Sequence, residues 1–371
     1  MPTQSPLAWG QYFYERSHAN LPGTDHALYR MTDLIARSTL DPNMARAVLH
    51  DSLLLDMVWR VTWADDDGLP DPFLPQRFAD CDGWVVFMHG WTGNNTIWEE
   101  MPAMIVRANP RLICLSVDHN GFGESKFEVD TPGLDQCCPP SAMSAMERLV
   151  NVLKIRRQPG EPGRKVINFV GHSMGGAALF YLNPLNFDIA EETRYAIAPA
   201  LLLNDSTHRA FFNAMGLGIG IVNRLRIFEP IEDLIKPGMV NAVCEGSSQF
   251  VKDAHTRQYN ETPRGTTSAT FRAMGMLHNW EIAHRWDLFR VLLGHKDNLV
   301  GLLPMMDMLS GMEVPAGHIR VVAGSHYMFS VGPDTVFQHA QNRDLAIQDI
   351  LGQHERALDM QKTGGGRRGF G

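Results

Sequence analysis

Short apolar runs alternate with stretches of helical periodicity between residues 84 and 170. Each run is short and continuously apolar, which is typical of a strand buried on both faces of a parallel sheet. Strands that alternate with helices in this way form a doubly wound α/β fold. The sequence therefore predicts such a fold, with strands at residues 53–63, 84–88, 111–117, 165–170, 198–203, 288–293 and 318–322 and helices at residues 97–108 and 143–154.

The alternation is interrupted between residues 205 and 286, where helical and glycine-rich apolar stretches take its place. Because strands resume after this segment, we interpret it as a cap inserted into one domain and not as the start of a second domain. The predicted organisation is an N-terminal helical extension (1–54), an α/β core in two parts (55–204 and 287–361), the cap (205–286) and a flexible glycine-rich tail (362–371).

A serine flanked by glycines follows the strand predicted at residues 165–170. Residues 171–175 read Gly-His-Ser-Met-Gly, a G-x-S-x-G pattern. Glycine on either side lets neighbouring backbone approach closely, as in the sharp strand-to-helix turn known as a nucleophile elbow. Ser173 is therefore a candidate nucleophile. On this pattern alone, a structural serine in a glycine-rich turn is the alternative.

Two candidate partners for Ser173 follow later strands of the predicted sheet. A serine hydroxyl needs a base, and the base needs an acid that fixes its tautomer. Asp297 follows the strand at residues 288–293, and His326 follows the last predicted strand. The carboxyl ends of parallel strands meet at one edge of a sheet, so these side chains are expected near Ser173. Asp205 is the alternative acid, and a hydrogen-bonded loop histidine is the alternative for His326.

Four motifs, in this order along the chain, resemble the α/β-hydrolase superfamily over roughly residues 55–355. Residues 88–93 (Met-His-Gly-Trp-Thr-Gly) look like its oxyanion loop. Residues 118–125 (Asp-His-Asn-Gly-Phe-Gly-Glu-Ser) are similar to its D-x-x-G-x-G-x-S turn. The serine elbow and its two later partners complete the set. The resemblance does not extend to the first 50 residues and identifies no subfamily.

The resemblance implies an oxyanion hole formed by the backbone N–H groups of Trp91 and Met174. Donors aimed at the developing oxyanion contribute roughly 3 to 4 kcal/mol each. Met174 follows the nucleophile at a helix N-terminus, where free amides favour negative charge. The chain departs from many members at His119 and Asn120, where Arg or Pro usually precedes the glycine. This departure alters the packing of the turn and removes no catalytic group.

The expected activity is that of a cofactor-independent serine hydrolase, which cleaves a carboxylic ester or lactone through an acyl-enzyme. Serine at the elbow argues against epoxide hydrolase and haloalkane dehalogenase chemistry, because those relatives carry aspartate there. Thioesterase, C–C bond hydrolase and acyltransferase activities use the same triad and remain open, as does a non-catalytic ligand receptor on this fold. The expected substrate pocket is apolar and is formed by Trp91, Phe211, Phe212, Ile219 and Trp280.

Composition limits the partners of the chain. The net charge is −8 and no run of Lys and Arg occurs, which argues against nucleic acid. No signal peptide and no apolar segment of membrane-spanning length are evident. Five cysteines without zinc-type spacing predict neither a disulfide framework nor a metal site, so a reducing, cytoplasmic location is expected. The expected partner is a small, hydrophobic ester or lactone, and the oligomeric state stays open.

Overall fold

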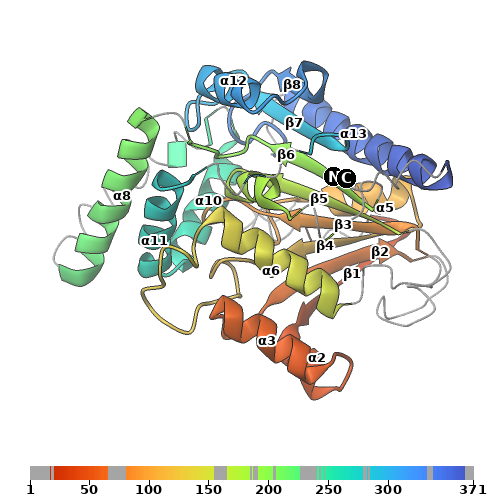
Figure 1. The fold of residues 1–371 in the computed structure, drawn as a ribbon, viewed down its shortest axis with the longest axis horizontal. Helices are drawn as coiled ribbons and strands as arrows, with labels where there is room; N and C mark the ends of the chain where they lie inside the picture. Colours follow the sequence, from red (N-terminus) through yellow and green to blue (C-terminus); the bar gives the residue numbers. More distant parts are fainter. Residues whose placement is uncertain are drawn as a thin grey trace, which may run out of the picture.

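A single eight-stranded sheet organises the protein (Figure 1). The structure is a computed structural model that describes residues 17, 21–65, 81–153, 165–183, 186, 191–203, 206–225, 240–241, 244–245, 247–278, 282, 285–331 and 337–363. The strand order is β1-β2-β4-β3-β5-β6-β7-β8, and all neighbours are parallel except β1 with β2 and β2 with β4. The strands are β1 (Thr24–Arg30), β2 (Val58–Ala64), β3 (Gly83–Met88), β4 (Leu112–Val117), β5 (Val166–His172), β6 (Glu192–Ile197), β7 (Phe289–Gly294) and β8 (Ile319–Val322).

Helices cover both faces of the sheet, as continuously apolar strands require. In β3, Trp84 and Val86 belong to the core on one face, while Val85 and Phe87 belong to the core on the other. The first face is covered by α3 (Pro42–Ser52), α6 (Pro139–Val152), α7 (Met174–Ala178) and α12 (Leu302–Gly311). The second is covered by α5 (Met101–Ala108) and α13 (Phe337–Lys362) (Figure 1). The predicted doubly wound, mostly parallel fold is confirmed.

The N-terminal segment contributes a strand to the sheet, where the sequence predicted only a helical extension. β1 pairs with β2 along its whole length, from Thr24 opposite Ala64 to Arg30 opposite Val58. The short helix α2 (Met31–Ala36) and then α3 follow it. β1 is an edge strand whose residues are mostly half-buried, so its sequence lacks the continuous apolar run that marks a central strand. The predicted boundary at residue 54 therefore does not separate an extension from the sheet.

The prediction of a strand at residues 198–203 is wrong, because the strand here is β6, Glu192–Ile197. β6 is fully buried although it begins with Glu192, Thr193 and Arg194. Its charges are paired inside the protein: Arg194 Nε lies 3.3 Å from Glu192 Oε2, and Arg285 also binds Glu192. Because these charges are paired, the strand can be buried although its sequence is polar. A search for continuous apolar runs therefore misses it.

The described part of the chain between β6 and β7 includes three helices with defined bounds, which lie within the segment predicted to be a cap. We call them the insertion helices: α8 (Ser206–Leu225), α10 (Gln249–Glu261) and α11 (Arg264–Gly275). In Figure 1, α8 stands at the margin of the molecule beside α11. Ser268 Oγ donates a hydrogen bond of 2.6 Å to the carbonyl of Gly216 and joins these two helices. Buried Ala269 and Phe271 connect α11 to the core.

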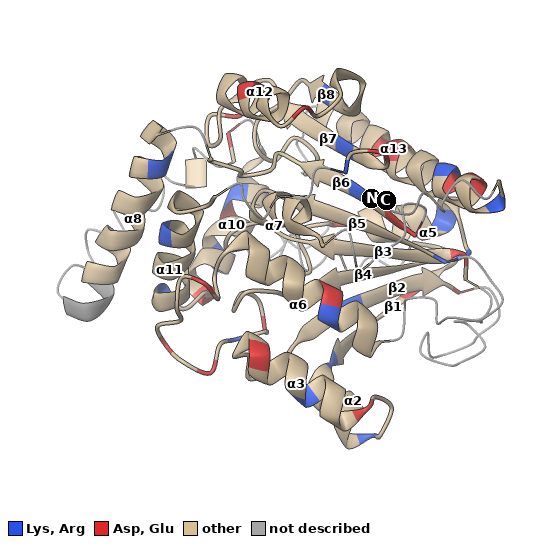
Figure 2. Cartoon of the chain, viewed as in Figure 1, with Lys and Arg blue, Asp and Glu red and all other residues tan. Residues whose placement is uncertain are grey.

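Charged side chains of both signs are interspersed over the molecule (Figure 2). Along α13, for example, Arg343 is followed by Asp344, and Glu355 by Arg356. In the part of the chain that the structure describes, no helix combines the length and the apolar content needed to cross a membrane.

Candidate active site

Ser173 forms a sharp turn between β5 and α7. Its backbone has φ 54° and ψ −115°, a conformation that a residue with a side chain rarely adopts. The flanking glycines make the turn sterically feasible. A Cβ on Gly171 would lie 2.3 Å from the carbonyl oxygen of Gly175, and a Cβ on Gly175 would lie 2.2 Å from that of Met88. The strained serine and its neighbours have the geometry expected of a nucleophile elbow.

The loop after β3 packs directly against this turn. A Cβ on Gly90 would lie 2.8 Å from Ser173 Cβ, so only glycine fits there, and Gly175 N donates a 3.2 Å hydrogen bond to the carbonyl of His89. The amides of Trp91 and Met174 donate no hydrogen bond to any described residue. Two free N–H groups therefore flank the serine, one on this loop and one at the start of α7.

Asp297 and His326 meet at the same edge of the sheet, after β7 and β8. His326 Nδ1 donates to Asp297 Oδ2 over 2.8 Å, and both side chains are buried. The other carboxylate oxygen accepts hydrogen bonds from the backbone amides of Leu299 (3.0 Å) and Val300 (3.2 Å). The carboxylate is thus fixed on both oxygens and holds His326 with Nδ1 protonated, which leaves Nε2 free to act as a base.

His172 joins the elbow to His326. Its Nε2 donates a 3.0 Å hydrogen bond to the carbonyl of His326, and the two rings lie 4.8 Å apart. Within the described chain, Ser173 Oγ makes no hydrogen bond to His326. A nucleophile and its base often reach hydrogen-bonding distance only when substrate is bound. The structure brings Asp297 and His326 into contact and places Ser173 next to His172, whereas Asp205 lies outside the described residues.

Buried, neutral histidines surround the site. Burial lowers the pKa of His119 to about 4 and that of His255 to about 3, and it lowers the pKa of His89 and His172 well below the usual range. His255 comes from α10 and packs edge-on against Tyr327, 4.1 Å between ring centroids. His255 could not be recognised from the sequence, because one histidine within a helix carries no motif. Near neutral pH, these rings therefore place no positive charge beside His326.

The D-x-x-G-x-G-x-S turn fastens the oxyanion loop to β4. Asp118 Oδ1 accepts from Asn95 N (2.6 Å) and Asn95 Nδ2 (2.9 Å), while its Oδ2 accepts from Glu124 N (2.8 Å). A Cβ on Gly123 would lie 2.2 Å from Asp118 Oδ2, and Ser125 Oγ accepts from Val58 N. Asp118 and Ser125 thus hold the turn against Asn95 and β2, and Gly123 leaves room for the Asp118 carboxylate. Burial raises the pKa of Asp118 to about 7.

The predicted pocket residues have different surroundings in the structure. Trp91 is half-buried and packs against Phe271 of α11, with 4.2 Å between ring centroids. Phe212 and Ile219 are buried on α8, and Phe212 also contacts Phe271. Phe211 is 49% exposed among the described residues and contacts Phe212, with 5.8 Å between ring centroids. Trp280 lies outside the described residues.

The cysteines form no disulfide in the described part of the chain. All five cysteines, including Cys137 and Cys138, are free thiols. Among the described residues, no group of three or more His, Cys, Asp or Glu side chains is arranged to hold a metal ion.

The chain belongs to the alpha/beta hydrolase family, whose model matches residues 85–338. That range begins in β3 and contains the elbow, the oxyanion loop and the Asp297–His326 pair. Among curated proteins, no relative matches the sequence.

Solved structures of this fold are similar to the chain at low sequence identity. One is an esterase (EaEST) from Exiguobacterium antarcticum, with 14% identity, a TM-score of 0.55 and coverage of 74% of this chain and 93% of that one. A bromoperoxidase from Bacillus anthracis has 14% identity, a TM-score of 0.57 and coverage of 80% and 95%. An esterase (RhEst1) from Rhodococcus sp. has 13% identity, a TM-score of 0.52 and coverage of 81% and 94%. At these identities the likeness shows the shared fold.

Proposed function

We propose that the protein is a serine hydrolase that cleaves a carboxylic ester or lactone through an acyl-enzyme. The observation that carries the proposal is the conjunction at one sheet edge of a strained serine, two unpaired amides and a fixed Asp–His pair. Two structural neighbours, the esterases from Exiguobacterium antarcticum and Rhodococcus sp., favour an ester among the bonds that such a site can cleave. The insertion helices act as the cap over the site.

In the proposed mechanism, Ser173 attacks the ester carbonyl while His326 Nε2 accepts the hydroxyl proton. Asp297 stabilises the imidazolium that forms and keeps its orientation. The amides of Trp91 and Met174 donate to the oxyanion, and the N-terminus of α7 adds its dipole to this stabilisation. His326 then gives the proton to the leaving alcohol. Water enters, His326 accepts one of its protons, and the resulting hydroxide attacks the acyl carbonyl. The bond to Ser173 Oγ then breaks, His326 returns the proton to Ser173, and the acid leaves.

Labelling with a fluorophosphonate tests the nucleophile directly. The wild-type protein is expected to form a covalent adduct at Ser173, detected by mass spectrometry, and to hydrolyse p-nitrophenyl butyrate. Ser173→Ala is expected to lose both. Ser144→Ala is the matched control, because Ser144 lies on α6 and its hydroxyl hydrogen-bonds only to Arg148 among the described residues. A folded wild-type protein that neither reacts with the probe nor cleaves the ester would show that the chain is a non-catalytic ligand receptor.

A further inference from the structure

One face of the insertion helix α10 lies against the loops that carry the proposed catalytic groups. His255, Gln258 and Tyr259 lie three and four positions apart on this face, and each is at most 6% exposed. His255 packs against Tyr327, which follows His326 in the loop after β8. Gln258 and Tyr259 contact the oxyanion loop and the residue that follows it. The same helix therefore touches both loops that the proposed reaction needs.

The contact between Gln258 and Asn94 has a fixed direction. Asn94 Oδ1 accepts a 2.9 Å hydrogen bond from the backbone N–H of Thr96, so this atom is the amide oxygen. Gln258 lies 3.0 Å from the same oxygen and therefore presents its Nε2 group there as a donor. Thr96 Oγ1 is a third donor to this oxygen, over 2.6 Å. Asn94 is thus held both from its own loop and from α10.

Stability alone does not explain a glutamine at this position. Gln258 Oε1 is buried and has no hydrogen-bond partner among the described residues. A buried acceptor without a partner costs free energy, and an apolar side chain of the same shape avoids that cost. Without Gln258, Asn94 Oδ1 would keep its two donors from Thr96. The glutamine therefore adds little net stability, and the effect of its hydrogen bond is to fix where the loop lies.

The β-turn at residues 90–93 carries the Trp91 amide. A 3.1 Å hydrogen bond between the backbones of its last and first residues closes this turn. The Trp91 ring packs edge-on against Tyr259, with 5.5 Å between ring centroids, and against Phe271 of α11, with 4.2 Å. In the part of the chain that the structure describes, both ring contacts of Trp91 are therefore with the insertion helices.

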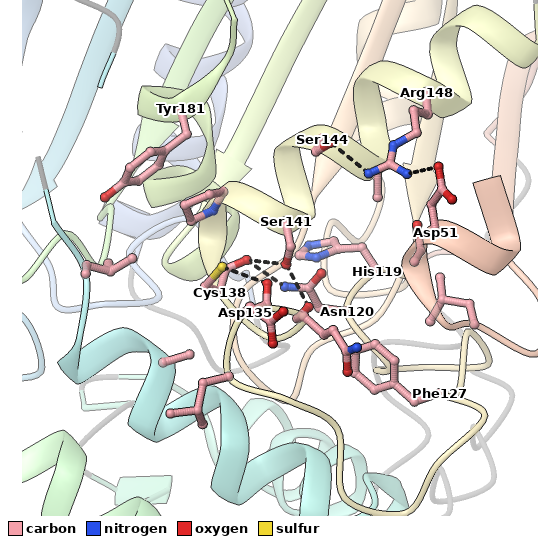
Figure 3. Close-up of a pocket in the computed structure, with 18 of the residues that line it drawn as sticks. Asp51, His119, Asn120, Phe127, Asp135, Cys138, Ser141, Ser144, Arg148 and Tyr181 are labelled. Carbon is pink, nitrogen blue, oxygen red and sulfur yellow. Dashed lines mark hydrogen bonds and ion pairs between the residues drawn. The ribbon is translucent and has the colours of Figure 1, made fainter. Parts of the chain in front are cut away.

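His119 holds the start of the oxyanion loop from another side. Its ring stacks on that of His89 with 4.1 Å between centroids, and its Nε2 donates a 3.0 Å hydrogen bond to the carbonyl of His89. His119 lies in the wall of a cavity of about 720 Å³, which α3, α6 and α11 also border (Figure 3). None of the described residues that line this cavity belongs to residues 90–94. His119 therefore supports the loop ahead of the turn and not the turn itself.

The core fixes the two ends of the segment that contains the turn. Ser173 packs against Gly90 at one end, and Asp118 accepts two hydrogen bonds from Asn95 at the other. Between these ends, the ring contacts and hydrogen bonds that the described residues make with other elements go to α10 and α11. The position of the turn thus depends on the insertion helices.

We propose that α10 aims the Trp91 amide at the oxyanion, and that Gln258 is the positioning residue through which it does so. This role of Gln258 rests on the proposed function, because it concerns the reaction of Ser173. Gln258 acts through Asn94 on the turn that carries the amide, while Tyr259 holds the ring of Trp91. The insertion thereby contributes to the chemical step as well as covering the site.

The test compares p-nitrophenyl butyrate with its thiono analogue, in which sulfur replaces the carbonyl oxygen. An amide placed for an oxyanion stabilises sulfur less well, so the loss of its alignment affects the oxygen ester more. Gln258→Met keeps the shape of the side chain and removes the donor. It is expected to lower kcat about tenfold for the oxygen ester and less than about twofold for the thiono ester, with KM little changed. Its midpoint of thermal unfolding is expected to equal or exceed that of wild type, because the unpaired Oε1 is gone.

Two other positions on α10 serve as controls. Arg257 precedes Gln258 but lies on the exposed side of the helix, where it pairs with Glu261 at 2.7 Å, and Arg257→Ala is expected to match wild type on both esters. His255→Phe changes the same face of α10 where it meets Tyr327, and it is expected to leave the ratio of the two kcat values unchanged. Gln258→Leu is measured as well and decides the matter if Gln258→Met does not fold.

Equal losses on both esters in the Gln258 variants, or wild-type kcat in them, would overturn the positioning role. A loss of kcat that comes with a lower unfolding midpoint would overturn it too, because the residue would then serve stability. A wild-type protein that fails to react with the fluorophosphonate would instead remove the proposed function. A wild-type protein that is labelled, with Gln258→Met equally active, removes the role of Gln258 alone.

Discussion

At the scale of single residues, the site depends on conformations that only a few side chains can hold. Ser173 has a positive φ, and Asp297 accepts three hydrogen bonds that leave its carboxylate no freedom. His326 therefore has one tautomer and one orientation in the resting protein. An acid in this position acts through the histidine, so its removal should affect the chemical step more than substrate binding.

Asp297→Asn tests this role. Asparagine keeps the shape but favours the wrong histidine tautomer, so kcat for p-nitrophenyl butyrate is expected to fall by about 10⁴-fold, with little change in KM. Asp205→Asn, the alternative acid in the sequence, is expected to retain kcat within about tenfold of wild type. Steady-state kinetics on both variants decides between them, and a large loss in Asp205→Asn with activity kept in Asp297→Asn would reverse the assignment.

At the scale of elements, glycines let β3, β5 and α7 approach each other. The hydroxyl of Ser173 can be presented at the sheet edge only because neighbouring backbones come closer than a side chain permits. The glycines of the G-x-S-x-G motif therefore have a steric role, which can be tested without any change to Ser173 itself.

Gly175→Ala is expected to destabilise the protein by about 1 to 3 kcal/mol, since the added methyl would lie 2.2 Å from the carbonyl oxygen of Met88. The methyl group would also displace the backbone next to Ser173, which is expected to lower kcat/KM by about 10²-fold. Gly352→Ala on α13 is the control, because a Cβ there meets nothing within 4 Å, and it is expected to stabilise by about 0.5 to 1 kcal/mol. Urea unfolding and ester hydrolysis measure both effects. Equal stability of the two variants would contradict the steric account.

Strands that bury mainly apolar side chains were predictable from the sequence, whereas β6, which buries charged side chains, was not. β3, β4 and β5 lie within a residue or two of their predicted ranges, because each is a continuous apolar run. β6 was missed because Glu192 and Arg194 neutralise each other only once the strand is in place. β1 was missed because an edge strand needs no continuous apolar run.

At the scale of the whole molecule, the fold buries an unusual set of neutral histidines. Burial lowers the pKa of His119 and His354 to about 4 and that of His255 to about 3, all below the unfolded value of 6.5. The unfolded chain takes up protons below pH 6.5 that these folded rings cannot accept, so acid favours unfolding. Asp118 changes the free energy of unfolding in the opposite direction. Its pKa is about 7 in the folded protein and 3.8 in the unfolded chain, so acid stabilises the folded form.

The free energy of unfolding is therefore expected to fall between pH 7 and pH 5. Each of the three histidines contributes a loss of about 2 kcal/mol, and Asp118 offsets about 2 kcal/mol of the total. Urea unfolding at pH 7, 6 and 5 measures the slope. Asp118→Asn is expected to steepen it, whereas His50→Gln, at an exposed position, leaves it unchanged. Stability that is constant or higher at pH 5 would show that the histidines titrate normally.

The sequence by itself determined β3, β4 and β5, the elbow and the order of its candidate partners, because these are local patterns: continuous apolar runs, glycines beside a serine, and side chains just after strands. Only the tertiary structure decided the place of β1, the buried ion pair of β6 and the protonation state of His119. The reason is that the state of a polar group depends on partners distant in the chain. His119 is neutral because it is buried against His89.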